Sequence, residues 1–359
     1  MKTNALLVLL TLVFASGTAG SQAATPDPGR YQRIVIHADS LVGNLAGDSP
    51  EREVSVYLPP AYSKDKKRRF PVLYLLHGFT DSDAKWFGLD GKHFVNVPTA
   101  ADAAFAKGVP EMIVVMPNAL NVFGGSFYSN SVTVGDWETF ITRTLVRHID
   151  SHYRTVARAE SRGLAGHSMG GYGALRLGMK TPGIFGALYA MSPCCVGANL
   201  DLDPKMFEGA LAVRTTAQIA GADFMSKAML ASAAAWSPNP KNPPLYLELP
   251  LANGKLVAHV AAEQIANAPL AMLPQYIPAL KSYRALGIDA GDKDDKIASD
   301  LALLHATFDE YSIVHTFEIY DGNHVNRIAD RLTNNVLPFF GKNLGPGRLV
   351  KPERARSAQ

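Results

Sequence analysis

The chain alternates short apolar runs with helical stretches, and this alternation limits its fold more than any other feature. The near-continuous apolar run at Val72–Leu76 is typical of a strand buried on both faces of a parallel sheet. Five further apolar runs follow, and helical stretches separate most of them. The pattern predicts an α/β fold with a doubly wound, mostly parallel sheet. The later runs lie in EMIVVMPNA, SRGLAGHS, FGALYAMSP, RALGIDAGD and SIVHTFEIYDG, and the expected helices cover about 97–107, 135–150, 170–180, 295–308 and 325–339.

Two parts of the chain depart from this alternation. The segments YQRIVIHAD and EREVSVYLPPAY alternate apolar and polar residues, which predicts a half-exposed hairpin at the sheet edge. Residues 196–281 separate the fourth and fifth buried runs by far more than an ordinary connection. We expect this helical insertion to form a cap over the carboxyl end of the sheet, where such folds bind ligands. A structural elaboration away from the site is the alternative.

The two ends of the chain predict export and a flexible tail. A lysine, an apolar run from Ala5 to about Ala15 and small residues up to Ala23 have the layout of a secretory signal peptide. A membrane anchor is the alternative, but the apolar run is short for a bilayer span. We therefore expect a periplasmic or secreted protein without a membrane span. The expected parts are a signal peptide at 1–23, one domain at 24–345 that includes the insertion, and a flexible basic tail at 346–359.

Composition and cysteine content exclude several classes of function. The chain has 359 residues, of which 47% are hydrophobic and 19% charged, so a globular protein is expected. The basic run at 64–70 predicts a solvated loop, and no nucleic-acid partner is expected because no basic surface with interleaved aromatic residues accompanies it. The two cysteines, Cys194 and Cys195, are adjacent, which predicts two buried thiols at a strand end. A vicinal disulfide is the alternative, and no metal site is expected.

The third buried run leads directly into a serine between small residues. Residues 166–170, Gly-His-Ser-Met-Gly, match the pattern G-x-S-x-G. In this pattern a sharp and strained strand-to-helix turn holds the serine hydroxyl above the sheet. Glycines flank it because strand and helix pass close together there. Ser168 is therefore the candidate nucleophile, and the rest of the chain must supply a base, an acid and an oxyanion site.

The base and the acid should follow later strands, in the order serine, acid, histidine. His324 follows the last predicted strand and is the candidate base, whereas His315 precedes that strand and His305 lies inside a predicted helix. The acid should follow the fifth buried run, in GIDAGDKDDKI, where Asp294 is preferred over its main rival, Asp292. Calcium binding is an alternative for this acidic loop, but the loop lacks the glycine and glutamate of an EF-hand.

The oxyanion of an acyl-transfer intermediate needs two N–H donors. One donor should be the backbone N–H of Met169, the residue after the nucleophile. The other should be the N–H of Phe79, in the loop LLHGFTDSD after the first buried run, where Gly78 permits the turn. His77 in the same loop is expected to make a structural hydrogen bond and not to act as the base.

Four stretches of the chain together resemble the putative-esterase family of α/β-hydrolases, over roughly residues 50–195 and 283–340. They are VSVYLPPAYSKDKKRRFPVLYLLHGF, GDWETFITRTLVRHIDSHYRT, GLAGHSMGGYGALRLGMKTPGIFGALYAMSP and DGNH. The family includes feruloyl esterases, siderophore esterases, S-formylglutathione hydrolases and mycolyltransferases. Its D-x-G-x-x-D motif is matched at 289–294, which supports Asp294. Its Gly-rich loop, NVFGGSFYSNSVTVGDW here, implies Phe127, Tyr128 and Asn130 as substrate-binding residues, with a packed surface loop as the alternative.

These observations predict an exported serine carboxylesterase. The expected reaction is hydrolysis of a small-molecule or glycan-linked ester through an acyl-enzyme on Ser168, with His324 as base, Asp294 as the orienting acid, and no metal or organic cofactor. An acyltransferase with the same triad and a sugar or alcohol acceptor is the first alternative. A non-catalytic scaffold that binds a glycan or a partner is the second. The insertion departs from the family pattern, so the substrate class and the oligomeric state stay open.

Overall fold

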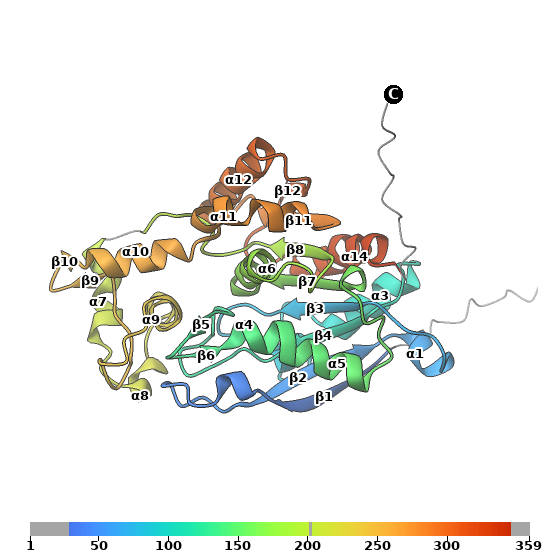
Figure 1. Cartoon of the computed structure of the whole chain (residues 1–359), viewed down its shortest axis with the longest axis horizontal. Helices are drawn as coiled ribbons and strands as arrows, with labels where there is room; N and C mark the ends of the chain where they lie inside the picture. The colour runs from blue at the N-terminus through green and yellow to red at the C-terminus, as the bar shows by residue number, and fades with distance from the viewer. Residues whose placement is uncertain (1–28, 201–202, 346–359) are drawn as a thin grey trace, which may run out of the picture.

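The computed structural model describes residues 29–200 and 203–345, and in these ranges one large sheet carries the fold (Figure 1). The predicted signal peptide and basic tail lie outside the described residues. All six predicted runs form strands of this sheet, but the sixth, expected to be buried, is largely exposed. The strand order is β1 (Arg30–His37), β2 (Glu51–Leu58), β4 (Ile113–Pro117), β3 (Val72–Leu76), β7 (Arg162–His167), β8 (Ala187–Met191), β11 (Ala285–Gly291) and β12 (Thr316–Tyr320).

The strand directions confirm a mostly parallel sheet with an antiparallel edge hairpin. β1 and β2 pair antiparallel at one edge, and β2 pairs antiparallel with β4. All pairings from β4 through β12 are parallel. β12 forms the opposite edge, and most of its side chains are exposed or half-buried.

Helices cover both faces of the sheet because the buried strands present apolar side chains on both sides. In β3, Val72, Tyr74 and Leu76 pack into one hydrophobic cluster, while Leu73 and Leu75 pack into the other. This is the two-residue period of a strand, and each fully buried aliphatic side chain contributes about 1.5–3 kcal/mol. The first cluster is covered by α4 (Trp137–Thr139), α5 (Val146–His152), α6 (Met169–Lys180) and α12 (Asp295–Glu310), and the second by α2 (Asp83–Trp86), α3 (Val97–Ala106), α13 (Ile328–Arg331) and α14 (Leu337–Asn343).

Two of the expected helices contain a wider turn. The stretch expected at 135–150 is α4 and α5 joined through Phe140–Leu145, and the stretch expected at 325–339 is α13 and α14 joined through Leu332–Val336. Short elements occupy the connections: α1 (Pro60–Lys64), β5 (Asn130–Ser131), β6 (Gly135–Asp136), and single turns at Asp39–Leu41 and Ala159–Ser161. None of the helices in the described ranges has the length and apolar character to cross a membrane.

The segment at 196–281 divides into two parts. Its last helix, α11 (Pro269–Lys281), packs against α6 and belongs to the helix layer over the sheet. The preceding elements gather beside β5 and β6, at the left of Figure 1. These are α7 (Pro204–Ala212), α8 (Thr216–Ile219), α9 (Phe224–Trp236), β9 (Leu251–Ala252), β10 (Lys255–Leu256) and α10 (Ala258–Ala266). We call α7 to α10 the cap.

Candidate active site

The carboxyl ends of the parallel strands meet at one edge of the sheet, and the three predicted catalytic residues follow three of these ends. Ser168 follows β7, Asp294 lies beyond β11 and His324 lies beyond β12. The Nε2 atom of His324 lies 2.9 Å from the Ser168 Oγ, and its Nδ1 atom lies 2.6 Å from the Asp294 Oδ2. The structure therefore joins three residues from distant parts of the sequence in one chain of hydrogen bonds.

Ser168 sits in a strained turn between β7 and α6. Its backbone has φ 57° and ψ −118°, a conformation that costs a non-glycine residue about 1–3 kcal/mol. Backbone hydrogen bonds hold the turn: the Ser168 N–H donates to the Met191 carbonyl at 3.0 Å, and the Ser168 carbonyl accepts from the N–H groups of Tyr172 at 2.9 Å and Cys194 at 3.2 Å. The turn directs the hydroxyl to His324, so Ser168 occupies the N-cap position of α6 without a side-chain cap bond.

The glycines around Ser168 are required by close backbone contacts, as the sequence predicts. A Cβ atom on Gly170 would lie 2.0 Å from the Leu76 carbonyl oxygen in β3. A Cβ atom on Gly166 would lie 2.2 Å from the backbone of Gly170. Real Cβ contacts are never this short, so no side chain fits at either position without moving the strand or the helix.

The loops that carry the acid and the histidine are bonded to each other. Asp292 accepts the Gly322 N–H at 2.9 Å, and the Lys293 N–H donates to the Gly322 carbonyl at 2.9 Å. Asp292 therefore joins the two loops, whereas Asp294 faces His324. Asp294 is the N-cap residue of α12 but makes no cap bond, so its carboxylate is available to the imidazole.

A third aspartate of this segment, Asp289, is a structural residue. It is fully buried in β11 and accepts hydrogen bonds from the Arg331 guanidinium at 2.6 Å and from the Tyr189 hydroxyl at 2.8 Å. Burial raises the pKa of Asp289, while the Arg331 charge opposes that rise. This ion pair ties β11 to α13 inside the protein.

His167 has a partner that the sequence does not reveal. Its Nε2–H donates to the His324 backbone carbonyl at 2.8 Å, and the two rings lie 4.7 Å apart between centroids. Trp86 and Phe94 enclose the other sides of the His167 ring. Burial lowers the pKa of His167 to about 3, so the ring is neutral near pH 7 and supports the His324 loop as a hydrogen-bond donor.

The loop after β3 lies directly beside the nucleophile. A Cβ atom on Gly78 would be 3.5 Å from the Ser168 Cβ. His77 is fully buried, its Nδ1–H donates to the Gly78 carbonyl at 2.8 Å, and its Nε2 accepts the Ala119 N–H at 2.8 Å. Burial lowers the pKa of His77. The ring is a neutral structural element of this loop, as predicted.

Two backbone N–H groups near Ser168 have no acceptor among the residues that the structure describes. The Met169 N–H is the first of α6, where helix geometry supplies no acceptor. The Phe79 N–H has no backbone acceptor among the residues that the structure describes. The Met169 donor directly follows Ser168 at the start of α6, and the Phe79 donor lies in the neighbouring loop after β3.

Of the three predicted substrate-binding residues, the structure brings only Phe127 to the cavity described below. Its ring packs 4.8 Å from Trp236 between centroids. Tyr128 is fully buried, and its hydroxyl donates to the His77 carbonyl at 3.0 Å, so it supports the loop after β3. Asn130 is exposed in β5 and does not line the cavity. The alternation of side chains along this Gly-rich loop could not be predicted because Phe127 and Tyr128 both have positive φ.

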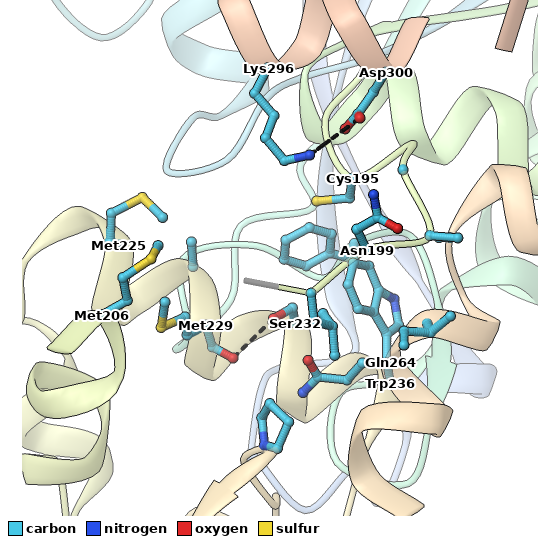
Figure 2. A pocket seen from close by; sticks show the side chains of 18 of the residues that line it. Cys195, Asn199, Met206, Met225, Met229, Ser232, Trp236, Gln264, Lys296 and Asp300 are labelled. Carbon is cyan, nitrogen blue, oxygen red and sulfur yellow. Dashed lines mark hydrogen bonds and ion pairs between the residues drawn. The ribbon is translucent and has the colours of Figure 1, made fainter. Parts of the chain in front are cut away.

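A cavity of about 270 Å³ lies between the cap and the carboxyl edge of the sheet. Its lining includes Cys195, whose neighbour Cys194 donates an N–H to the Ser168 carbonyl at 3.2 Å, but Ser168, Asp294 and His324 are not among the lining residues. Figure 2 shows methionines of α7 and α9 along one side and an ion pair of α12 above them. The labelled lining residues are Cys195, Asn199, Met206, Met225, Met229, Ser232, Trp236, Gln264, Lys296 and Asp300.

The adjacent cysteines are free thiols that differ in burial. Cys194 is half-buried and Cys195 is exposed, with 3.2 Å between their Sγ atoms. The prediction of two buried thiols is therefore wrong for Cys195, because positive φ at this residue turns its side chain toward the cavity. The neighbouring Cys195 thiol and burial raise the pKa of Cys194.

A serine turn between a parallel strand and a helix, followed along the chain by an aspartate and a histidine beyond later strand ends, is the arrangement of an α/β-hydrolase. A family model described as putative esterase matches residues 49–248, more than half of the chain. The chain belongs to this family, as the sequence motifs indicated.

Named relatives share parts of the chain. An esterase of Mycobacterium tuberculosis is 38% identical over 137 residues, which cover 37% of this chain and 27% of that protein. An endo-1,4-beta-xylanase/feruloyl esterase of Xylanibacter ruminicola is 32% identical over 165 residues, which cover 44% of this chain and 21% of that protein. The chain thus spans about a quarter of the length of these relatives.

Solved structures confirm the α/β-hydrolase fold. A ferulic acid esterase superimposes with a TM-score of 0.61 at 22% identity, covering 88% of this chain and 98% of that one. The serine hydrolase FphF of Staphylococcus aureus superimposes with a TM-score of 0.59 at 16% identity, covering 88% and 99%. At these identities the likeness shows the fold alone.

Proposed function

We propose that the protein is a serine carboxylesterase whose nucleophile is Ser168. The hydrogen-bonded chain from Ser168 through His324 to Asp294 is the observation that carries this proposal. Membership of the putative esterase family supports the same reaction class. We assign the remaining requirement, an oxyanion site, to the N–H groups of Phe79 and Met169, which have no acceptor among the described residues.

Acylation begins when the Ser168 Oγ attacks the ester carbonyl carbon and its proton passes to the Nε2 of His324. The Asp294 carboxylate accepts the Nδ1–H, which holds the imidazole in the tautomer whose Nε2 is a base and stabilises the imidazolium that forms. The N–H groups of Phe79 and Met169 donate to the oxyanion of the tetrahedral intermediate. His324 then returns the proton to the leaving alcohol, and Ser168 keeps the acyl group.

Deacylation repeats these steps with water as the nucleophile. His324 takes a proton from the water, the hydroxide attacks the acyl carbon, and the same N–H groups stabilise the second oxyanion. Collapse of this intermediate breaks the bond to the Ser168 Oγ, which regains its proton from His324. The products are a carboxylic acid and an alcohol, and the residues return to their starting state.

The cap cavity is proposed to hold an apolar part of the substrate. Its side chains are largely apolar, and the thioethers of Met206, Met225 and Met229 can adapt to ligands of different shape. The cavity is somewhat smaller than most sites for drug-sized ligands, which occupy about 300–1,000 Å³. An ester with a short or medium-sized apolar group therefore fits this site best.

The first test is hydrolysis of p-nitrophenyl acetate, butyrate and octanoate by the wild type and by Ser168→Ala. We expect the substitution to reduce kcat by about 10⁴-fold or more, because only binding and the oxyanion site remain. Unchanged turnover in Ser168→Ala would disprove the mechanism. Absent turnover of every ester by folded wild type, with acyl transfer to an added alcohol or sugar, would favour the acyltransferase.

The same esters test the role of the cavity. Ala228 lines it from α9, and Ala228→Leu adds volume there without touching the catalytic residues. We expect kcat/KM to fall several-fold more for octanoate than for acetate. An equal effect on both esters would place the acyl chain outside the cavity.

We also propose that the protein is exported to the periplasm or secreted. The support is the leader-like layout of the first 23 residues, a lysine followed by an apolar run and small residues.

A further inference from the structure

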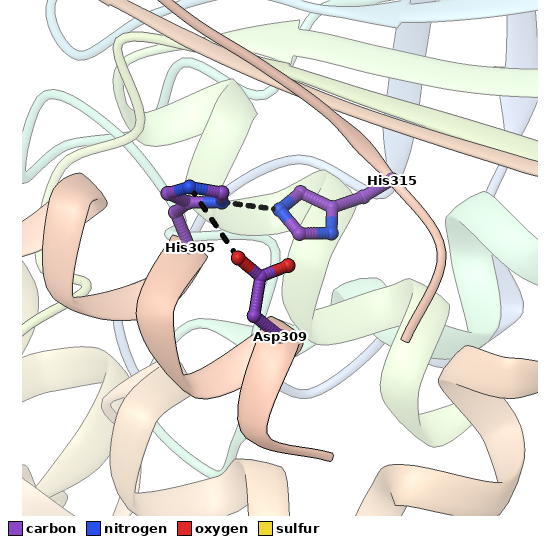
Figure 3. A group of neighbouring side chains, drawn as sticks. All are labelled: His305, Asp309 and His315. Carbon is purple, nitrogen blue, oxygen red and sulfur yellow. Dashed lines mark hydrogen bonds and ion pairs between the residues drawn. The ribbon is translucent and has the colours of Figure 1, made fainter. Parts of the chain in front are cut away.

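Two histidines and an aspartate meet on the surface, at the opposite end of β12 from His324. His305 and Asp309 are one helical turn apart on α12, and His315 lies just before β12. One ligand atom from each of the three lies within 4.8 Å of the other two. Figure 3 shows the three side chains converging from the helix and the following segment. The proposed esterase reaction has no use for them.

The His315 ring is oriented as a metal ligand would be. Its Nδ1–H donates to the Ile313 carbonyl at 2.8 Å, which leaves a lone pair on Nε2. That Nε2 faces the Nδ1 of His305 at 2.8 Å. Metal-binding histidines commonly donate their second ring N–H to a backbone carbonyl in this way, because the bond selects the tautomer and directs the ring.

Aromatic side chains hold both imidazoles in place. The His305 ring stacks on Phe317 with centroids 4.1 Å apart and an angle of 14° between planes. The His315 ring meets the edge of Phe308, a buried residue of α12, at 5.0 Å. The Asp309 Oδ2 lies 3.6 Å from the Nε2 of His305, which brings the carboxylate to the same ring. Two fixed rings and one carboxylate reduce the entropy lost when ligands gather around an ion.

We propose that His305, Asp309 and His315 bind a divalent transition-metal ion of the zinc class. Imidazole nitrogens and a carboxylate suit Zn²⁺, which takes such ligands at about 2.0–2.2 Å in tetrahedral geometry. That geometry separates ligand atoms by about 3.3 Å, so the two imidazoles need to open only slightly from their direct contact. The Asp309 side chain is 63% exposed, and water can therefore complete the coordination.

The bound ion would join the end of α12 to the start of β12. The other ends of these two elements lead to Asp294 and His324, because α12 begins directly after Asp294 and His324 follows β12. Only a short connection between Glu310 and Thr316 links the two elements at the cluster. Metal binding is thus expected to stabilise the edge of the sheet and not to enter the reaction.

The proposal is tested with the full chain, treated with chelator, dialysed and titrated with Zn²⁺ in competition with a chromogenic indicator. We expect His315→Gln to lose one equivalent of bound Zn²⁺, or to bind it at least tenfold more weakly, and Asp309→Asn to weaken the same equivalent. The matched control is His148→Gln combined with His152→Gln. These two residues form another one-turn pair on α5, with His148 half-buried, His152 exposed and their rings stacked at 4.0 Å, but no third ligand among the described residues joins them.

A second measurement keeps the outcome clear if a variant is unstable. Zn²⁺ should raise the thermal midpoint of the wild type and of the His148/His152 control, but not that of His315→Gln. Without metal, the circular dichroism of His315→Gln and its hydrolysis of p-nitrophenyl acetate should match the wild type. Absent Zn²⁺ binding by the wild type would overturn the proposal. Loss of the equivalent in the His148/His152 variant, with retention in His315→Gln, would overturn it as well.

Discussion

Ser168 and Asp294 are both residue types that commonly cap helices, and both sit at N-cap positions without making the cap bond. Each side chain instead meets His324. A missing cap costs about 1 kcal/mol per helix. At the residue scale, the candidate site therefore uses two side chains that begin helices but bond to His324 and do not cap those helices.

The first residue-scale prediction separates the two rival aspartates. Asp294→Asn should lower kcat for p-nitrophenyl butyrate by about 10³–10⁴-fold, because an amide favours the wrong tautomer of His324. Asp292→Asn keeps an oxygen that can accept the Gly322 N–H, so we expect less than about a tenfold loss. Steady-state kinetics of the two variants check this, and the reverse ranking would mean that Asp292 is the acid.

The second concerns His167, whose pKa is lowered to about 3 by burial, from about 6.5 in the unfolded chain. Between these two pH values, His167 binds more protons in the unfolded state than in the folded state. The free energy of unfolding therefore rises with pH in this range, and it falls when the pH drops below about 6.5. One such group contributes a slope of up to about 1.4 kcal/mol per pH unit. We expect the free energy of unfolding, measured with urea at pH 7 and pH 5, to change less with pH for His167→Asn than for the wild type.

His77 is also buried with a lowered pKa, but it is present in both proteins and cancels in this comparison. Equal slopes for the two proteins would mean that His167 titrates normally in the folded state. Loss of ester hydrolysis in His167→Asn without loss of folding would in turn support its role in holding the His324 loop.

At the scale of elements, burial on both faces made the central strands predictable. Runs such as Val72–Leu76 are apolar at every position because helices cover both sides of the sheet. The packing of the predicted cap was not predictable in the same way, because its helices pack on one another and on the Gly-rich loop. The sequence accordingly placed α11 inside the insertion, although it packs against α6.

The candidate site was likewise predictable only in part. Ser168, Asp294 and His324 follow strand ends, and strand order brings such positions together. The cavity wall could not be predicted, because it joins residues from the cap, the Gly-rich loop and α12 that no local pattern connects. The sequence predicted no metal site, because His315 meets His305 and Asp309 only where the chain returns into β12.

The element-scale prediction concerns the crossing of α6 over β3. Gly170→Ala places a methyl group 2.0 Å from the Leu76 carbonyl oxygen, so strand and helix must separate. We expect a loss of about 3 kcal/mol or more in the free energy of unfolding, together with reduced activity. Gly221→Ala is the matched control, since its Cβ would meet no atom closer than 3.8 Å. Similar urea midpoints for both variants would contradict the prediction.

At the scale of the whole molecule, the proposed export makes a simple prediction about mass. Expression in a host with a secretory pathway should yield a mature protein that lacks about the first 23 residues, because signal peptidase cleaves after small residues such as Ala23. Intact-mass spectrometry of the protein from the periplasm or medium checks this. An unprocessed amino terminus on the purified protein would rule out export by cleavage.

The position of β12 at the edge of the sheet has a consequence for the whole enzyme. The proposed nucleophile follows the central strand β7, whereas the proposed base follows β12, which pairs with one strand among the described residues. Edge elements fray at a lower free energy than the centre of a fold. In the proposed mechanism, fraying of β12 would separate His324 from Ser168 while the core stays folded, so we expect activity to depend on the local stability of this edge strand.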